Sequence, residues 1–415
     1  FKPEVLIHAF GEKDMYVSTK SAFSSKINAI CKANFGNEIY GAFDLYIAFI
    51  LQCNRLVANN GIVSLILPNK FTVAKYAKKI REKLLSHYTL LEIVDLSEMD
   101  IFKKVDVYPI VFSYKNALPN QNHKVNTMMS VKNYKDLFNQ NNITLVSQTL
   151  YKQIGEMHTF FCLPNKGGFE KYFENLFVNH DKIGKFLEFR STVSFHFKGL
   201  REKYVKQDFD DTIDLKKIKK YLGGVSYAKR NEVGRFKIDW NKYYINYYEE
   251  QLKAIGNPLP PLNIFERTKI IFCQHAKELT AAYDEYGVWV TKDVYPIAYA
   301  KDELRKTGLS VKYLTALLNS KLYSFIYGVI YKGVQIAQGY YHYLPTWISV
   351  LPIVIPSTED IKVIEQLVDE AMSNPNRIDV IMEKIDERIF NLYSINNEQK
   401  EVIYSFFGYK KPVHS

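Results

Sequence analysis

The first third of the chain alternates two kinds of apolar pattern, and this alternation constrains the fold more than any other feature. Residues 41–61 and 72–88 carry apolar side chains at the three- and four-residue spacing of an amphipathic helix. Residues 62–68, 90–98 and 107–116 are short, continuous apolar runs, as in strands buried on both faces. This order predicts an α/β domain with a largely parallel sheet covered by helices.

The first of these apolar runs ends in a Pro-Asn-Lys-Phe tetrad, Pro68 to Phe71. In α/β sheets, ligands bind outside the carboxyl ends of the strands, so Asn69, Lys70 and Phe71 are candidates for one wall of a site. A second interpretation stays open, because proline can simply end the strand while Asn69 caps the following helix.

In the last of the three runs, strand alternation places Ile110, Phe112 and Tyr114 on one face. For Phe112 we consider a role in the sheet core, beneath the covering helices, at least as good an interpretation as any role in a site. Tyr114 precedes Lys115 at the end of the run, and we expect its ring to be exposed.

The remaining chain changes character twice. Residues 119–183 show weak periodicity and polar turns, which indicates a connector after a first domain of residues 1–118. Residues 184–357 combine short strands and loops with many basic and aromatic side chains, so we expect a mixed α+β domain. Residues 358–415 return to helical spacing with acidic openings, which predicts a helical tail.

Composition narrows the class of partner. The net charge is +11 and the pI is about 9.1, values that favour a polyanion such as nucleic acid, although a basic surface can also serve solubility alone. The 31 tyrosines and 27 phenylalanines can fill a core or stack on exposed bases, and composition does not separate these uses. No long apolar run predicts a membrane span, and neither the cysteine nor the histidine spacing predicts a metal site.

Residues 216–248 are the most basic and aromatic stretch, which suits a surface that follows a phosphate backbone. A solvated charged face is the alternative for each cation. The candidate phosphate contacts in and near this stretch are Arg201, Lys203, Lys229, Arg230, Arg235 and Lys242. The candidate base-reading residues, chosen because Arg reads guanine and Asn or Gln reads adenine, are Arg230, Asn231, Arg267, Gln274 and His275.

Several segments resemble, in the same order, the TaqI-like adenine-N6 DNA methyltransferases, a group that includes fused restriction-modification enzymes. "DLYIAFILQCNRLVANNGIVSLILPNKF" and "LLEIVDLSEMDIFKKVDVYPIVFSY" resemble the second half of the catalytic domain. "GRFKIDWNKYYINY", "FERTKIIFCQHAKELTAAYDEYGVWVTKDVYPI" and "IDERIFNLYSINNEQKEVI" resemble the target-recognition domain and its helical tail. The resemblance implies a partial Rossmann-like methyltransferase domain, a target-recognition domain and a tail, in a bacterial cytoplasmic protein.

The resemblance also implies roles for the candidate residues. Asn69, Lys70, Phe71, Phe112 and Tyr114 would border the pocket for an extruded adenine. The glycine-rich acidic loop that holds S-adenosylmethionine and the Asn-Pro-Pro-Tyr motif of such enzymes do not occur in the sequence. We therefore expect no catalytic residues here, and no S-adenosylmethionine bound by this chain alone.

The expected function is sequence-specific recognition of duplex DNA within an adenine-specific methyltransferase of a restriction-modification or phage-defence system. The donor-binding part would come from a missing N-terminal segment. In one alternative, the chain is a non-catalytic specificity subunit that docks on a separate methyltransferase subunit. In another, it is a basic RNA-binding protein.

Overall fold

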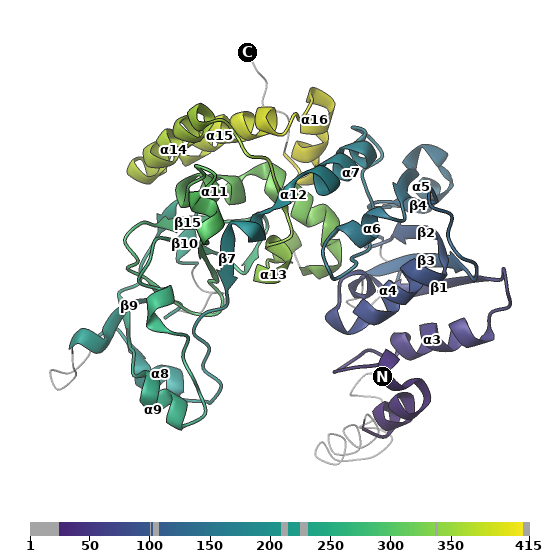
Figure 1. Ribbon diagram of the computed structural model, residues 1–415, viewed down its shortest axis with the longest axis horizontal. Helices are drawn as coiled ribbons and strands as arrows, with labels where there is room; N and C mark the ends of the chain where they lie inside the picture. Colours follow the sequence, from purple (N-terminus) through teal and green to yellow (C-terminus); the bar gives the residue numbers. More distant parts are fainter. Residues whose placement is uncertain are drawn as a thin grey trace. The chain divides into compact units, whose positions relative to one another are not determined.

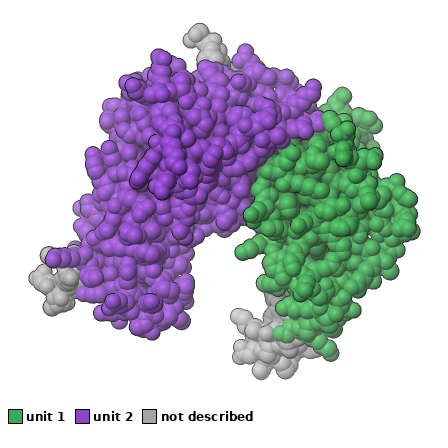
Figure 2. All heavy atoms as spheres, viewed as in Figure 1, with its two compact units in different colours: residues 1–160 green, residues 161–415 purple. Residues whose placement is uncertain are grey.

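The structure is a computed structural model that describes residues 25–99, 101–102, 108–208, 215–224, 231–336 and 339–409. The chain forms two compact units, residues 1–160 and 161–415, which Figure 2 colours separately. The predicted connector, residues 119–183, is shared between them: its first part adds two strands to the first unit, and its last part forms a helix of the second.

Unit 1 is built on one five-stranded sheet in the order β1-β3-β2-β4-β5 (Figure 1). β3 lies between β1 and β2 and is antiparallel to both, and only β2 and β4 pair in parallel. The prediction of a largely parallel sheet is therefore wrong. Helical segments connect β1 to β2 and let the two run in the same direction, whereas β3 runs antiparallel to both, and apolar runs do not encode strand direction. The strands are β1 (Ile62–Pro68), β2 (Thr89–Asp95), β3 (Pro109–Lys115), β4 (Lys124–Met128) and β5 (Thr144–Ser147).

Helical spacing predicted the helices that form within residues 41–61 and 72–88, but not the other helical segments of unit 1. Residues 25–35 are helical, and they are followed by η1 (Gly36–Glu38), α3 (Tyr46–Leu56), η2 (Asn69–Thr72), η3 (Lys75–Ala77), α4 (Lys78–His87), α5 (Tyr134–Phe138), η4 (Gln140–Asn142) and α6 (Leu150–Gln153). α4 presents Ile80, Leu84 and Leu85 to the interior, as expected for an amphipathic helix.

A buried arginine holds together the segments around the end of β1. Arg81 of α4 is fully buried, and its guanidinium donates to the carbonyl oxygens of Phe71 (2.7 Å), Ala74 (3.0 Å), Met157 (2.8 Å) and His158 (3.1 Å). Burial lowers the pKa of Arg81. Because these four partners are all backbone carbonyls, Arg81 ties the turn after β1 to the end of the unit.

Unit 2 contains several small sheets. Their orders are β16-β9-β12-β8, β15-β13-β17-β7, β14-β19-β18, β10-β11 and β20-β6. The strands are β6 (Asp181–Lys182), β7 (Leu187–Arg190), β8 (Val205–Lys206), β9 (Ile218–Leu222), β10 (Val233–Gly234), β11 (Lys237–Ile238), β12 (Tyr243–Asn246), β13 (Lys269–Phe272), β14 (His275–Ala276), β15 (Ala281–Asp284), β16 (Val290–Thr291), β17 (Ile297–Ala300), β18 (Gln335–Ile336), β19 (Tyr340–His342) and β20 (Pro352–Ile353).

A buried ion pair crosses the second of these sheets. Lys269 on β13 and Asp284 on β15 are register partners with side chains 0% and 3% exposed, and the Lys269 ammonium donates to Asp284 Oδ2 and to the Phe265 carbonyl (2.6 Å). Asp284 also accepts from the backbone N–H groups of Val288 and Trp289, both at 3.1 Å. The pair therefore fixes the turn that leads into β16.

The helices of unit 2 lie mainly towards its C-terminal end. α14, α15 and α16, drawn in yellow-green to yellow in Figure 1, pack with α11 and α12. The helices are α7 (Phe169–Asn179), α8 (Leu200–Tyr204), α9 (Glu249–Ala254), α10 (Asp302–Arg305), α11 (Val311–Asn319), α12 (Lys321–Ile330), α13 (Pro345–Ile348), α14 (Thr358–Ser373), α15 (Ile378–Leu392) and α16 (Asn397–Phe406).

The aromatic richness of the sequence serves the interior of unit 2. The largest fully buried side chains include Tyr313, Tyr323, Tyr327, Tyr331 and Tyr343. Several of their hydroxyls donate to backbone carbonyls; that of Tyr323, for instance, lies 2.7 Å from the Pro352 oxygen. Among the residues that the structure describes, no helix is long and apolar enough to span a bilayer.

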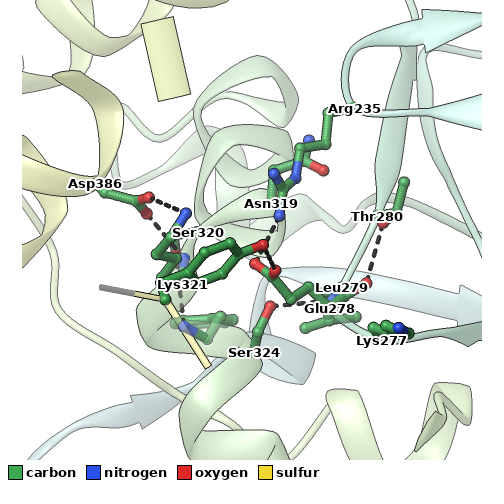
Figure 3. A network of polar contacts seen from close by, with 12 residues as sticks. Arg235, Lys277, Glu278, Leu279, Thr280, Asn319, Ser320, Lys321, Ser324 and Asp386 are labelled. Carbon is green, nitrogen blue, oxygen red and sulfur yellow. Dashed lines mark hydrogen bonds and ion pairs between the residues drawn. The ribbon is translucent and has the colours of Figure 1, made fainter. Parts of the chain in front are cut away.

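A second buried charge connects α12 with α15. Asp386 is 1% exposed and accepts from the backbone N–H of Lys321 (2.8 Å) and from its ammonium (3.4 Å), as Figure 3 shows. Burial raises the pKa of Asp386 to about 6, although Lys321 opposes the shift. The carboxylate is therefore held ionised at neutral pH at a cost in free energy.

We predict that Arg81→Met destabilises unit 1 by about 3 kcal/mol, because four backbone carbonyls lose a charged donor. The three tryptophans, Trp240, Trp289 and Trp347, all lie in unit 2. Urea unfolding followed by far-UV circular dichroism should therefore shift without a matching shift in tryptophan fluorescence. Lys79→Met, which removes an exposed cation of the same helix, should change stability by about 0.5 kcal/mol. Equal effects of Arg81→Met and Lys79→Met would contradict the stabilising role given to the buried Arg81.

We predict that Asp386 makes unit 2 less stable as the pH rises. In the unfolded chain Asp386 ionises near its ordinary pKa of about 4, whereas in the folded chain it holds its proton up to about 6. The folded state binds more protons than the unfolded state between these pH values. The contribution of Asp386 to the free energy of unfolding therefore falls by about 2 kcal/mol from pH 4 to pH 7. Asp386→Asn should lack this fall in tryptophan-monitored urea unfolding, whereas Asp379→Asn, at an exposed position of α15, should retain it.

Candidate nucleic-acid interface

A cleft of about 460 Å³ opens on the surface of unit 2. One wall is the loop from Ser194 to Gly199 with the start of α8, and the other is formed by Lys292 and Asp293, which follow β16. The cleft combines three cations, two carboxylates and two phenylalanines, a composition suited to a charged ligand with an aromatic part. We call it the basic cleft.

Backbone contacts fix both walls of the basic cleft. Val193 forms a parallel bridge with Lys292, and the Asp293 N–H donates to the Val193 oxygen at 2.9 Å. Asn257, which is fully buried, accepts from the His196 N–H at 2.7 Å and donates to the Ser194 oxygen at 3.1 Å. Hydrogen bonds therefore fix the backbone from which the cleft side chains project.

The wall formed by Lys292 and Asp293 requires a glycine at position 223, which packs against Lys292. Its φ is +102°, and a Cβ at this position would lie 2.3 Å from the Lys292 Cβ. The Gly223 N–H donates to a carboxylate oxygen of Glu232 at 2.6 Å. Only glycine permits β9 to approach Lys292 this closely, so the sequence reserves the space that Lys292 occupies.

The charges of the basic cleft are incompletely neutralised. Arg201 is half-buried, with its side chain 34% exposed, and Nη1 lies 3.7 Å from the carboxylate of the largely exposed Glu202. Arg201 Nε is buried without a hydrogen-bond partner in the described structure. Across the described part of the chain, Lys198 and Lys292 form no ion pair, and Asp293 accepts from the Ser194 hydroxyl at 3.3 Å.

Three predicted base readers lie next to one another beside this cleft. The Gln274 N–H donates to the Val294 oxygen (2.9 Å) and its oxygen accepts from the Tyr343 N–H (2.7 Å), so its half-buried side-chain amide stands on a fixed backbone. In the described structure that amide has no hydrogen bond. Asn231 bonds to Cys273 Sγ and accepts from the Tyr295 hydroxyl, and these contacts place it near Gln274 but occupy its amide.

His275 stacks on His342 across the paired strands β14 and β19. The ring centroids lie 4.6 Å apart with an angle of 18° between the ring planes. Burial lowers the pKa of His342 to about 4, and the neighbouring His275 adds to this effect. Burial also lowers the pKa of His275, against the opposing charge of Asp293. Both rings are therefore neutral at pH 7, when each offers one donor and one acceptor.

The other predicted contacts are dispersed. Lys203, Lys242 and Arg267 are exposed, and Arg267 stacks on the Tyr299 ring at 4.4 Å. Arg235 instead pairs with Glu278 at 2.7 Å, and Glu278 also accepts from the Tyr409 hydroxyl (Figure 3). The structure thus gives Arg235 an internal partner. Lys229 and Arg230 lie outside the described residues.

The predicted pocket residues of unit 1 are mostly interior. Phe71 and Phe112 are fully buried against each other, with ring centroids 5.4 Å apart, and both rings also contact Phe160. The expectation that Tyr114 is exposed is wrong: it is fully buried, and its hydroxyl donates to Asn54 at 2.7 Å. The rings point to the side of the sheet that is covered, so none presents a free face to a base.

The Pro68–Phe71 tetrad at the end of β1 fits neither predicted interpretation completely, neither the wall of a site nor a strand end followed by a helix cap. Asn69 is 8% exposed and donates to the Ser97 hydroxyl at 3.3 Å, and it does not cap the helical turn that it begins. Of the candidates Asn69, Lys70 and Phe71, Lys70 alone is exposed. The proline ends the strand as expected, whereas tertiary contacts to the end of β2 decide the orientation of Asn69.

Sequence reasoning missed Lys198, Lys292 and Asn257. The two lysines lie outside residues 216–248, in segments 94 positions apart that the Val193–Lys292 bridge and the hydrogen bonds beside it bring together. Asn257 lies in "NPLPPL", which resembles an ordinary turn. Its complete burial, which is unusual for an amide, is visible only in three dimensions.

Two family models match the chain. Residues 226–353 match the TaqI-like C-terminal specificity domain, and residues 16–102 match the Eco57I restriction-modification methylase. The type II methyltransferase M.BstVI of Geobacillus stearothermophilus is 33% identical over 78 residues, which are 19% of this chain and 14% of that protein.

Solved structures extend the comparison to the fold. The type IIL restriction-modification enzyme MmeI in complex with DNA matches with a TM-score of 0.52 and 10% identity, over 91% of this chain and 53% of that one. The type IIG restriction endonuclease BpuSI matches with a TM-score of 0.36 and 12% identity, over 94% and 52%. The chain thus spans about half of each of these enzymes. The likeness to MmeI concerns the fold, with its mixed α/β content.

The matched segments lie in different units and in the order that the sequence analysis gave. The methylase match falls in unit 1, and the specificity-domain match covers the predicted base readers from Arg230 to His275. The predicted resemblance of this chain to the TaqI-like DNA methyltransferases of restriction-modification systems is therefore confirmed.

Proposed function

We propose that this chain recognises a specific sequence in duplex DNA as part of an adenine-N6 DNA methyltransferase of a restriction-modification or phage-defence system. One observation carries the proposal. Within the unit that matches a specificity domain, the unbonded amide of Gln274 and the neutral ring of His275 stand beside the basic cleft. Base readers next to phosphate-binding cations are what recognition of a defined DNA register requires.

Gln274 is the best-supported base reader. A side-chain amide can donate to N7 and accept from N6 of adenine, or serve other base edges singly. Its backbone is bonded through both its N–H and its oxygen, so no backbone ordering is needed when its amide engages a base. Lys203, Lys242 and Arg267 are proposed as more distant contacts. Asn231 and Arg235 support the interface from within, since their polar groups already have partners.

Unit 1 is proposed to pair with a donor-binding segment carried on the same or on another polypeptide. β1 is an edge strand: in the described structure its only strand partner is β3. Its side chains Ile62 and Ile66 are 63% and 57% exposed, and Phe49 and Leu56 of the preceding α3 are 67% and 74% exposed. Unpaired edges with exposed apolar side chains are typical of surfaces that add a strand.

The donor-binding strand is the favoured occupant of this edge for a chemical reason. The matched methylase segment lacks the glycine-rich loop and the Asn-Pro-Pro-Tyr motif in the sequence, so donor binding and methyl transfer require residues from elsewhere. In the assembled enzyme, S-adenosylmethionine would supply the methyl group to adenine N6 after the base is extruded. Unit 2 would supply the recognition step.

We predict that Gln274→Ala relaxes the preference at one base position. Duplexes selected from a random pool by the wild type should share a defined sequence, and discrimination at one position should fall by about tenfold or more in the variant. Gln366→Ala, at an exposed position of α14, should leave the selected sequence unchanged. If the wild type selects no common sequence from the pool, the recognition function is wrong.

We predict that the 415-residue chain alone does not bind S-adenosylmethionine in the range typical of enzyme substrates, up to about 1 mM. The physical reason is that the chain offers no glycine-rich loop to hold the donor. Isothermal titration of the chain with S-adenosylmethionine should give only heats of dilution. A saturable heat with a dissociation constant below about 1 mM would contradict the division of labour proposed for unit 1.

A further inference from the structure

We propose that the basic cleft binds one phosphodiester group of the DNA backbone, with Arg201, Lys198 and Lys292 as its ligands. This assignment rests on the proposed function, to which it adds a defined anchor for the DNA. It singles out one place among many surface cations of unit 2 as a built phosphate site.

The chemistry of the cleft suits a singly charged phosphodiester. Arg201 can direct two parallel N–H groups at two phosphate oxygens, and the two lysines add ammonium donors. The two carboxylates lower the net charge of the lining to +1, which matches one phosphodiester better than a phosphate monoester with its higher charge. Glu202 is 69% exposed and 3.7 Å from Arg201, so solvent weakens its competition for the guanidinium.

The geometry distinguishes this cleft from an ordinary charged surface. The Val193–Lys292 bridge and the buried Asn257 hold both walls, and Gly223 leaves room for the Lys292 side chain. Cations that are already held in place lose less conformational entropy on binding than free surface lysines do. The two half-buried cations, Arg201 and Lys292, are therefore expected to contribute more than exposed ones.

The cleft lies beside the proposed base readers, so a phosphate bound there would position the DNA relative to them. Lys292 and Asp293 directly precede Val294, whose oxygen accepts from the Gln274 N–H, and Asp293 lies close enough to His275 to oppose the lowering of the His275 pKa by burial. A phosphate bound in the cleft would thus fix the register of the bases that Gln274 and His275 face. Phe197, which is 54% exposed on the cleft wall, offers an apolar surface for the adjoining sugar or base.

The test is the salt dependence of DNA binding by the full chain. Each phosphate contact contributes about −0.9 to the slope of log affinity against log salt concentration, which corresponds to about tenfold in affinity at 0.1 M salt. Arg201→Gln and Lys292→Gln should each reduce the slope by a part of this amount, because both cations neutralise the same phosphate, and should weaken every duplex equally. Arg201→Lys keeps the charge and should recover most of the slope.

A matched control comes from α10 of the same unit. Arg305 has a side chain 81% exposed and lies outside the cleft, so Arg305→Gln should leave the slope unchanged. Tryptophan fluorescence confirms that each variant is folded. Lys198→Gln removes an exposed cation, so it tests the cleft even if the half-buried variants unfold.

The outcomes separate this proposal from the proposed function. Unchanged slopes in all cleft variants, with sequence selection intact in the wild type, would overturn the phosphate site and leave DNA recognition standing. Reduced slopes in a protein that selects no sequence would support the site and overturn the recognition function. If the cleft variants weaken binding of an RNA duplex of the same sequence while DNA binding stays unchanged, the assignment to DNA is wrong.

Discussion

The buried pair Lys269–Asp284 is the constraint on which the proposed interface depends. Two ions held away from water are stable only when each is hydrogen-bonded, and Asp284 meets this requirement by also accepting from the N–H groups of Val288 and Trp289. Those bonds determine where the chain enters β16, and β16 ends at the lysine and aspartate of the basic cleft. A charge in the core thus positions charges at the surface.

Buried polar groups recur as positioning devices in both units. Arg81 ties the turn after β1 to Met157 and His158, and Asn257 holds the loop from Ser194 to His196. Each side chain binds backbone rather than another side chain, so each fixes a segment that has no regular secondary structure of its own. A hydrophobic contact could stabilise these loops but would not set their register, because apolar attraction is non-directional.

Both units bury many of their aromatic side chains in the interior. Composition left open whether the tyrosines and phenylalanines fill a core or face a ligand, and the structure buries Phe71, Phe112 and Tyr114 in unit 1 and a tyrosine cluster in unit 2. Several buried tyrosine hydroxyls donate to backbone carbonyls. The basic cleft presents three cations, with Phe197 as an exposed ring on its wall.

The sequence by itself determined the helices and strands within residues 41–116, the helical C-terminal segment and the resemblance to restriction-modification methyltransferases, because periodicity and motif order are local properties. It did not determine strand direction: β3 runs antiparallel between β1 and β2, although all three are similar apolar runs. It also did not locate the candidate site. Arg201 and Lys292 are 91 positions apart, and contacts between their two segments bring them together in the fold. Tertiary structure likewise decided that Arg235 is bound internally while the amide of Gln274 has no hydrogen bond in the described structure, because partners distant in sequence settle which polar groups are already satisfied.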